Sequence, residues 1–295
     1  MNYKLEKKVR DNAPVRHAFN DLAGQIFQLS FESWYEDGFW SDRYLPYTLM
    51  DGGSAIANVS VNLMKIRWNG QIKNYIQLGT VMTHPAYRGQ GLSRRLFEEI
   101  FKDWETRCDG FYLFANDTVL DFYPRFGFRK ETEYVCSFPV SPRTAGEAGK
   151  ARRLRMDSPS DRGLLEACYR MSNPFSLLPS LDNFGLLMFY CSSFLKDCVY
   201  YLPDYDTAVV AEQDAKSGTL ICHDIFCPQN RSLHEILSCL APDGTQKAVL
   251  EFLPRGISDS LLTPLSNEDD TLFTRIPGEN PFDGHKLRFP GLSHA

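Results

Sequence analysis

The spacing of hydrophobic and polar positions in residues 1–140 predicts strands that alternate with helices. The clearest helix covers residues 91–104, where apolar side chains recur at helical spacing and charged side chains fill the opposite face. A second helix-like stretch covers residues 14–36, and Asn69-Gly70 is typical of a tight hairpin turn. Strands are expected at residues 3–9, 47–50, 55–66, 75–83, 111–115 and 133–138, with a short helix at 117–123.

The pattern of residues 151–295 repeats this order of elements. A weakly patterned segment with Pro, Gly and Ser, residues 141–150, separates the two halves and is interpreted as a connector. The recurrence at a period of about 150 residues predicts a duplicated α/β fold, although the halves share no obvious sequence identity. Strands are expected at 152–156, 199–202, 208–212, 219–226, 248–253 and 271–276, and helices near 161–171, 182–195 and 232–240.

Composition indicates a folded chain with a sizeable core. Hydrophobic residues make up 43% of the 295 residues and charged residues 23%, which argues against global disorder. The net charge of −5 is a poor match for a nucleic-acid-binding protein. The longest mostly apolar window, residues 184–195, is too short and too polar to span a membrane, and the charged N-terminus does not resemble a signal peptide. We therefore expect a cytoplasmic protein with neither a nucleic-acid nor a membrane partner. The sequence does not indicate the oligomeric state.

The eight cysteines show no CxxC pair, and a chain of this length does not need disulfide bonds for stability. We expect free thiols in a reducing compartment. Cys222, His223 and Cys227 lie close together in the sequence but have no second pair at zinc spacing, so no metal site is predicted.

A glycine-containing turn joins the predicted strand 75–83 to the helix 91–104. Pro85 ends the strand, and Arg88-Gly89-Gln90-Gly91 leads directly into the helix. Glycine lets the backbone approach a ligand closely, and the free amides and positive dipole end of a helix N-terminus favour an anion. The turn therefore predicts a phosphate or pyrophosphate cradle, with Arg88 as an additional donor. It is neither a Walker A loop nor a dinucleotide fingerprint. An ordinary strand–helix turn is the alternative.

Residues 81–93 resemble the acyl-CoA signature of the GNAT superfamily of N-acyltransferases, Gln/Arg-x-x-Gly-x-Gly/Ala. The matching residues are Arg88-Gly89-Gln90-Gly91-Leu92-Ser93, in which Ser93 departs from the final Gly or Ala. A second segment, Asn116-Asp117 followed by Phe122-Tyr123-Pro124-Arg125-Phe126-Gly127-Phe128, is similar to the family's second cofactor motif. The resemblance implies a catalytic GNAT domain over residues 1–140. The expected fold class is α/β, with a mostly antiparallel mixed sheet, flanking helices and a splayed strand pair.

The resemblance also implies acetyl-CoA as cosubstrate and a role for individual residues. The pantetheine arm would pair with the backbone of Val81, Met82 and Thr83, and Gly79 suggests a bulge that helps to splay the strand. Asn116 would lie beside the pantetheine or the leaving thiol. Tyr123 matches the position that often protonates the leaving thiolate, and the alternative is a core aromatic residue. The pyrophosphate would lie on Arg88, Gly89, Gln90, Gly91, Leu92, Ser93 and Arg94.

The general base is harder to assign. Many relatives carry a Glu on the strand that corresponds to 75–83, where this sequence has no acidic residue. His84 follows that strand and is interpreted as structural. An amine deprotonated through water could attack directly, in which case transfer depends on proximity, an oxyanion donor from the strand backbone and Tyr123.

Residues 151–295 are predicted to form a degenerate GNAT-like domain without its own cofactor, because residues 227–233, which follow the strand 219–226, contain no glycine. The tandem arrangement resembles the enhanced-intracellular-survival acetyltransferases without their C-terminal lipid-carrier-like domain. The tandem thiol-capping synthases are a weaker match. In the first group the terminal carboxylate can act as the base, so a role of Ala295 at the first active site is a hypothesis.

Residues 31–44 are rich in aromatic and acidic residues, and in this fold they border the acceptor site. Trp34, Glu36 and Tyr44 are candidates for binding a cationic amine. The alternative is that the aromatics pack against the second domain and the acids are solvated. The acceptor could be polyamine-like, aminoglycoside-like, an amino acid derivative or a peptide amine. We expect an N-acetyltransferase with one active site in the N-terminal domain. An inactive acyl-CoA-binding sensor or scaffold, which the missing strand carboxylate favours, is the alternative.

Overall fold

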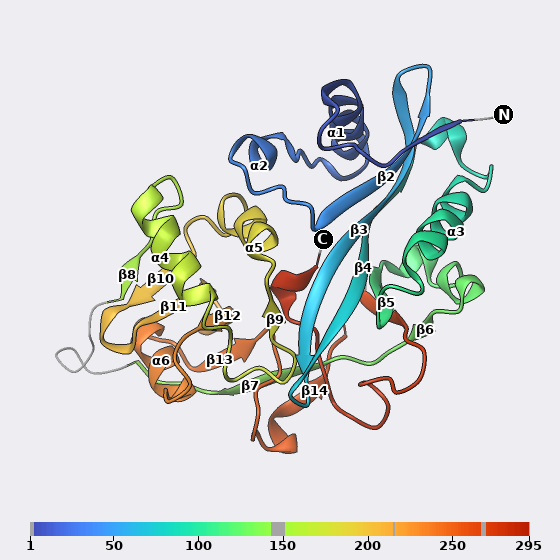
Figure 1. Ribbon diagram of the computed structural model, residues 1–295. Coiled ribbons are helices and arrows are strands. Elements are labelled where there is room, and N and C mark those ends of the chain that lie inside the picture. Colours follow the sequence, from blue (N-terminus) through green and yellow to red (C-terminus); the bar gives the residue numbers. More distant parts are fainter. Residues whose placement is uncertain (1–2, 143–150, 215, 267–269, 295) are drawn as a thin grey trace.

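The computed structural model describes residues 3–142, 151–214, 216–266 and 270–294. It contains two mixed sheets that lie side by side, each with its own helices (Figure 1). The first sheet has the strand order β1 (Lys4–Glu6), β2 (Tyr44–Asp51), β3 (Ser54–Trp68), β4 (Gln71–Thr83), β5 (Gly110–Ala115), β15 (Thr271–Arg275) and β6 (Arg129–Lys130), with β9 (Ser180–Leu181) beside β3. Its helices are α1 (Ala13–Phe27), α2 (Glu32–Glu36) and α3 (Leu92–Trp104).

The second sheet has a similar layout. Its strand order is β14 (Leu262–Pro264), β7 (Tyr134–Pro139), β13 (Lys247–Leu250), β12 (Thr219–Phe226), β11 (Thr207–Asp214), β10 (Val199–Leu202) and β8 (Arg152–Arg153). Its helices are α4 (Pro159–Tyr169), α5 (Phe184–Cys191) and α6 (Leu233–Leu240). The unit β4–α3–β5 of the first sheet corresponds to β12–α6–β13 of the second, because each helix connects two parallel neighbouring strands. The expected fold class, two α/β bodies in tandem, is confirmed.

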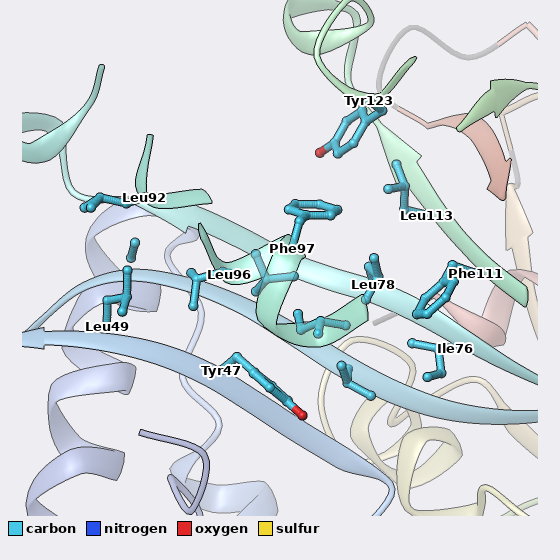
Figure 2. Packing of buried hydrophobic residues seen from close by; sticks show 14 of the residues in the cluster. Tyr47, Leu49, Ile76, Leu78, Leu92, Leu96, Phe97, Phe111, Leu113 and Tyr123 are labelled. Atoms are coloured by element: carbon cyan, nitrogen blue, oxygen red, sulfur yellow. The ribbon is translucent and has the colours of Figure 1, made fainter. Parts of the chain in front are cut away.

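The core of the first body lies between α3 and the sheet. Leu96, Phe97 and Ile100 are completely buried, as the helical spacing of their apolar positions predicts. Figure 2 shows Leu96 and Phe97 of α3 packed among side chains of β2 and β4, with Tyr123 at the margin of the cluster. Burial of a large apolar side chain contributes about 1.5–3 kcal/mol, so this face fixes α3, and with it the turn that precedes it.

Local signals in the sequence are confirmed in two places and corrected in one. Asn69 and Gly70 both have positive φ, 48° and 80°, and join β3 to β4 as a tight hairpin. Helix α3 begins and ends within one residue of the expected range. The single helix expected at 14–36 is wrong, because Gln28 adopts a left-handed conformation with φ of 57° and ends α1 before α2 begins.

Two strands belong to the opposite sheet from the one that the sequence order suggests. The strand expected at 133–138 is β7, which pairs with β13 and β14 of the second sheet rather than closing the first. The strand expected at 271–276 is β15, which pairs antiparallel with β5, Phe273 lying opposite Leu113. Short apolar strands carry no local mark of their partner, so only tertiary packing assigns them. The division into 1–140, 141–150 and 151–295 stays a prediction, and most of the connector lies outside the described residues.

Candidate functional site

The neighbouring strands β4 and β5 separate halfway along their length. Their parallel pairing runs from Tyr75 opposite Gly110 to Leu78 opposite Leu113, whereas β4 continues to Thr83 and β5 to Ala115. Beyond Leu78 the facing edge of β4 is therefore open towards β5. A cavity of about 1130 Å³ lies at this split and extends to the start of α3.

A strained bulge marks the point where β4 leaves its neighbour. The register between β3 and β4 shifts between Asn58 and Ser60, and Thr80 has a φ of +46°, which is rare for a β-branched residue. Partly buried hydrogen bonds hold this conformation: the Asn58 side-chain amide donates to the Thr80 carbonyl at 3.0 Å, and the hydroxyls of Thr80 and Tyr44 lie 2.6 Å apart. The bulge suggested by Gly79 thus lies at the next residue.

The glycine turn forms an open surface at the N-terminus of α3. Gly89 and Gly91 have φ of 76° and 73°, and no atom lies within 4 Å of where either would carry a Cβ. Gly91 caps α3, whose first amides have no partner within the helix and whose dipole is positive at this end. The hydroxyls of Thr83 and Ser93 lie 3.1 Å apart and tie the end of β4 to the first turn of α3. Such a turn can accept a phosphate on its backbone.

The cavity brings together most of the residues that the sequence singled out. Gln90 and Glu36 do not line it: the Gln90 side chain accepts a hydrogen bond from the Tyr3 hydroxyl at 3.2 Å, and Glu36 is exposed. The roles of all these residues stay predictions. Those that line the cavity are Trp34, Tyr44, Val81, Met82, Thr83, Arg88, Gly89, Gly91, Leu92, Ser93, Arg94, Asn116 and Tyr123.

Tyr123 lies in a short helical turn after β5, with its ring against Phe97 and Phe273. The side chain is 5% exposed, and burial raises the pKa of its hydroxyl to about 12. The phenol is consequently protonated at neutral pH. The burial of the ring fits a core aromatic residue, and its place in the cavity lining fits a proton donor. Both interpretations made from the sequence therefore stay open.

Asn116 and His84 each cap a short turn beside the cavity. The Asn116 side-chain oxygen accepts hydrogen bonds from the amide and the hydroxyl of Thr118, and Asn116 also lines the cavity. The His84 ring accepts a hydrogen bond from the Ala86 amide at 3.3 Å, a structural role. Its Nδ1 atom is therefore already engaged.

The aromatic segment 31–44 faces the second body. The Trp34 indole donates a hydrogen bond of 2.7 Å to the carbonyl of Gly185 in α5, as the packing interpretation of this segment requires. Trp34 and Tyr44 nevertheless line the cavity. Glu32 pairs with Arg16 at 3.0 Å. The acids of this segment that the structure describes do not line the cavity.

The second half contributes a wall that sequence reasoning missed. Phe189, Tyr190 and Phe194 of α5 and the turn after it line the cavity, together with Asp270 and His294. The His294 ring stacks on Phe114 of β5 with centroids 3.5 Å apart. Burial lowers the pKa of His294 to about 3, so the imidazole is neutral. No short-range pattern could have revealed these contacts, because they join residues far apart in the sequence. Ala295 lies outside the described residues, so its hypothesis stays open.

In the second sheet, β12 and β13 correspond to β4 and β5, and the C-terminal segment of the chain fills the place that corresponds to the β4–β5 split. Glu251 follows β13 and contacts His223 of β12 at 2.7 Å. The amide of Gly291 donates to the Glu251 carbonyl at 2.9 Å, and Leu292 is buried in the core of the second body. Figure 1 shows this red final segment in the middle of the molecule. The loop after β12 has a Ser232 cap in place of a glycine cradle.

Two further features bear on chemistry and location. Within the described ranges, no group of three or more His, Cys, Asp or Glu side chains could hold a metal ion. None of the helices described has the length and apolar character needed to cross a membrane.

Comparisons with known proteins agree with this geometry. Residues 51–130 match the model of the acetyltransferase (GNAT) domain family. No curated protein matches the chain. Among solved structures, a probable N-acyltransferase from Enterococcus faecalis V583 has 14% identity and a TM-score of 0.66, over 94% of this chain and 72% of that one. Eis1 from Mycobacterium abscessus has 15% identity and a TM-score of 0.60, over 93% of this chain and 73% of that one.

The two sheets and the split strand pair define a tandem GNAT fold. The match to the GNAT acetyltransferase domain model covers residues 51–130, which include β4, the glycine turn and α3. At these low identities the solved structures support the fold alone.

Proposed function

We propose that this protein is an N-acetyltransferase that moves an acetyl group from acetyl-CoA to a primary amine by direct attack, at one active site in the N-terminal half. One observation carries the proposal: the β4–β5 split and the open glycine turn share a single cavity with Tyr123. A structural turn alone would not need an open backbone surface, a split sheet and a buried phenol in the same place.

The residues of the cavity fit the cosubstrate. The amides of Gly89 and Gly91, the first turn of α3 and the guanidinium groups of Arg88 and Arg94 would hold the pyrophosphate. The free edge of β4 at Val81, Met82 and Thr83 would pair with the pantetheine arm, with Asn116 opposite. Acetyl-CoA supplies an activated acetyl thioester at this place.

The chain's own groups would manage the protons of the transfer. The amine nitrogen bonds to the carbonyl carbon while the carbon–sulfur bond breaks, and Tyr123 gives its hydroxyl proton to the departing sulfur. The pKa of about 12 keeps that proton on Tyr123 at neutral pH. The β4 residues 75–83 carry no acid, so the amine would lose its proton to water. Backbone amides of β4 would stabilise the developing oxyanion.

The second body would serve as support rather than as a second enzyme. The chain's own segment occupies the position that corresponds to the β4–β5 split, and the loop after β12 has no glycine. We therefore infer that residues 151–295 form a degenerate GNAT-like domain without a cofactor of its own. A small-molecule or peptide amine as the partner and a cytoplasmic location belong to the same proposal.

Titration calorimetry with acetyl-CoA, followed by an acetyl-transfer assay on a panel of amines, tests the proposal. We expect one site per chain and release of free CoA thiol that depends on the amine. Two sites would overturn the silent second body, and no binding would overturn the cavity assignment. Binding without transfer to any amine would favour the inactive sensor or scaffold, the alternative that the absence of a carboxylate on β4 supports.

A further inference from the structure

Three of the exposed large hydrophobic side chains that the structure describes line the cavity. In the part of the chain that the structure describes, four large hydrophobic side chains are exposed: Phe27 at 42%, Ile72 at 53%, Val119 at 37% and Phe194 at 60%. All but Ile72 line this cavity. Val119 lies on the Asn116 side, whereas Phe27 is the last residue of α1 and Phe194 lies in the turn after α5. Exposed apolar groups concentrated in one concave place indicate an apolar ligand.

The apolar side chains form one continuous wall across the two halves. The rings of Phe31 and Phe189 stack with centroids 5.3 Å apart, and Phe189 contacts Phe194 at 5.8 Å. Trp34 meets Phe189 edge-on at 5.5 Å. The wall is buried at Phe31 and Trp34 and open to solvent at Phe194.

The charged side chains that line the cavity are mostly arginines. Arg88, Arg94 and Arg125 belong to the glycine turn, α3 and the turn after β5, where the phosphates would lie. Among the described lining residues, Asp270 is the one carboxylate. Glu32 is paired with Arg16, and Glu36 is exposed outside the cavity. An acceptor with several ammonium groups would need several carboxylates around it, and the described lining residues provide one.

We propose that the acceptor is a monoamine with an apolar body, such as an aryl or alkyl group, which lies on the wall of Phe31, Phe189 and Phe194 with its amine directed to the β4–β5 split. This inference rests on the proposed N-acetyltransferase function and narrows its substrate class. The wall accommodates the acceptor rather than a long acyl chain for a geometric reason. An acceptor enters from solvent, where Phe27 and Phe194 are exposed, whereas an acyl chain stays attached to the thioester in the split.

Steady-state acetylation of four primary amines tests the substrate class. The panel is 2-phenylethylamine, hexylamine, ethanolamine and spermidine, with acetyl-CoA saturating. We expect kcat/KM for the two apolar amines to exceed that for the two polar ones by at least about tenfold, because burial of a ring or an alkyl chain is worth that much. Equal values, or a preference for spermidine, would overturn the inference.

Matched variants locate the subsite. Phe194→Ser and Phe27→Ser should each lower kcat/KM for 2-phenylethylamine about tenfold more than they lower kcat/KM for ethanolamine. Ile72→Ser, an exposed residue on the β3–β4 hairpin outside the cavity, is the control and should change neither. An effect of Phe194→Ser on octanoyl-CoA use, with amine ranking unaltered, would assign the wall to the acyl chain and refute the proposal.

A binding measurement separates failure of the subsite from failure of the enzyme. With CoA in place of acetyl-CoA no transfer occurs, so calorimetry can follow 2-phenylethylamine binding directly. Binding that Phe194→Ser weakens would support the apolar subsite even if no acetyl transfer were found, and the proposed function would then fail alone. Absence of binding, or binding insensitive to Phe194→Ser, would overturn the subsite.

Discussion

The indole of Trp34 donates a 2.7 Å hydrogen bond to the carbonyl of Gly185, joining α2 of the first body to α5 of the second. The segment around Trp34 and Phe39 can approach α5 this closely because Gly185 has no side chain. A Cβ at Gly185 would overlap the carbonyl oxygen of Phe39. The meeting of Trp34 with α5 therefore depends on a glycine that lies far from Trp34 in the sequence.

Replacement of that glycine should disturb both stability and the acceptor side of the cavity. Gly185→Ala must push α5 away from α2, and overpacking of this kind costs about 1–3 kcal/mol of unfolding free energy. Gly163→Ala in α4 is the matched control, since a Cβ there meets no atom within 4 Å. Alanine should stabilise that helix by about 0.5–1 kcal/mol. Urea unfolding of both variants measures the difference, and equal stabilisation of the two would contradict the close contact.

Gly91→Glu should abolish acetyl-CoA binding. The substitution puts a negative charge at the N-terminus of α3 and a side chain into the open turn, at a φ of 73° that disfavours any residue with a Cβ. Gly256→Glu is the control for backbone strain, because Gly256 has a φ of 67°, open surroundings and no place in the cavity. Calorimetry gives the affinities. Normal CoA affinity in Gly91→Glu would refute the cradle.

Tyr123→Phe should leave CoA affinity intact and lower kcat about a hundredfold, since proton transfer by a positioned group typically contributes that much or more. The control is Tyr87→Phe, which removes another phenol that lines the cavity but is hydrogen-bonded to Asp51 at 2.9 Å. Turnover with a saturating amine separates the two. If Tyr123→Phe turns over at the wild-type rate, Tyr123 is a core residue and not the acid.

Asp224→Asn should change how stability depends on pH. Burial raises the pKa of Asp224 to about 7, above its unfolded value near 3.8. Folding then favours the protonated carboxyl, so wild-type stability falls as pH rises from about 4 to 7 and levels off above. Asparagine keeps the oxygen that accepts from Asn173 and Ile225 but cannot ionise.

The stability gained by Asp224→Asn should therefore grow between pH 4 and 7, by up to about 4 kcal/mol, and then stay constant. Urea unfolding at a series of pH values measures it. Asp243→Asn, at an exposed carboxyl, is the control for the removal of a surface charge. A gain for Asp224→Asn that is the same at pH 4 and pH 7 would mean that the carboxyl is already ionised in the folded protein at low pH.

Local patterns predicted the elements that local physics controls. The apolar face of α3, the Asn69-Gly70 hairpin and the glycine turn each depend on residues a few positions apart, and each is present in the structure. The left-handed Gln28 that separates α1 from α2 was missed, because a non-glycine residue in this conformation has no reliable sequence signal.

The glycine turn, the two-body α/β organisation and the position of Tyr123 after β5 could be predicted from the sequence, because they follow from the periodicity of apolar positions and from glycine conformation. Tertiary structure alone decided the rest. It exchanged β7 and β15 between the sheets and placed His294 on Phe114. It also added one wall of the cavity from α5. The physical reason is that short apolar strands and isolated aromatic side chains are stabilised by whatever surface buries them, and that surface exists only once the two bodies have packed.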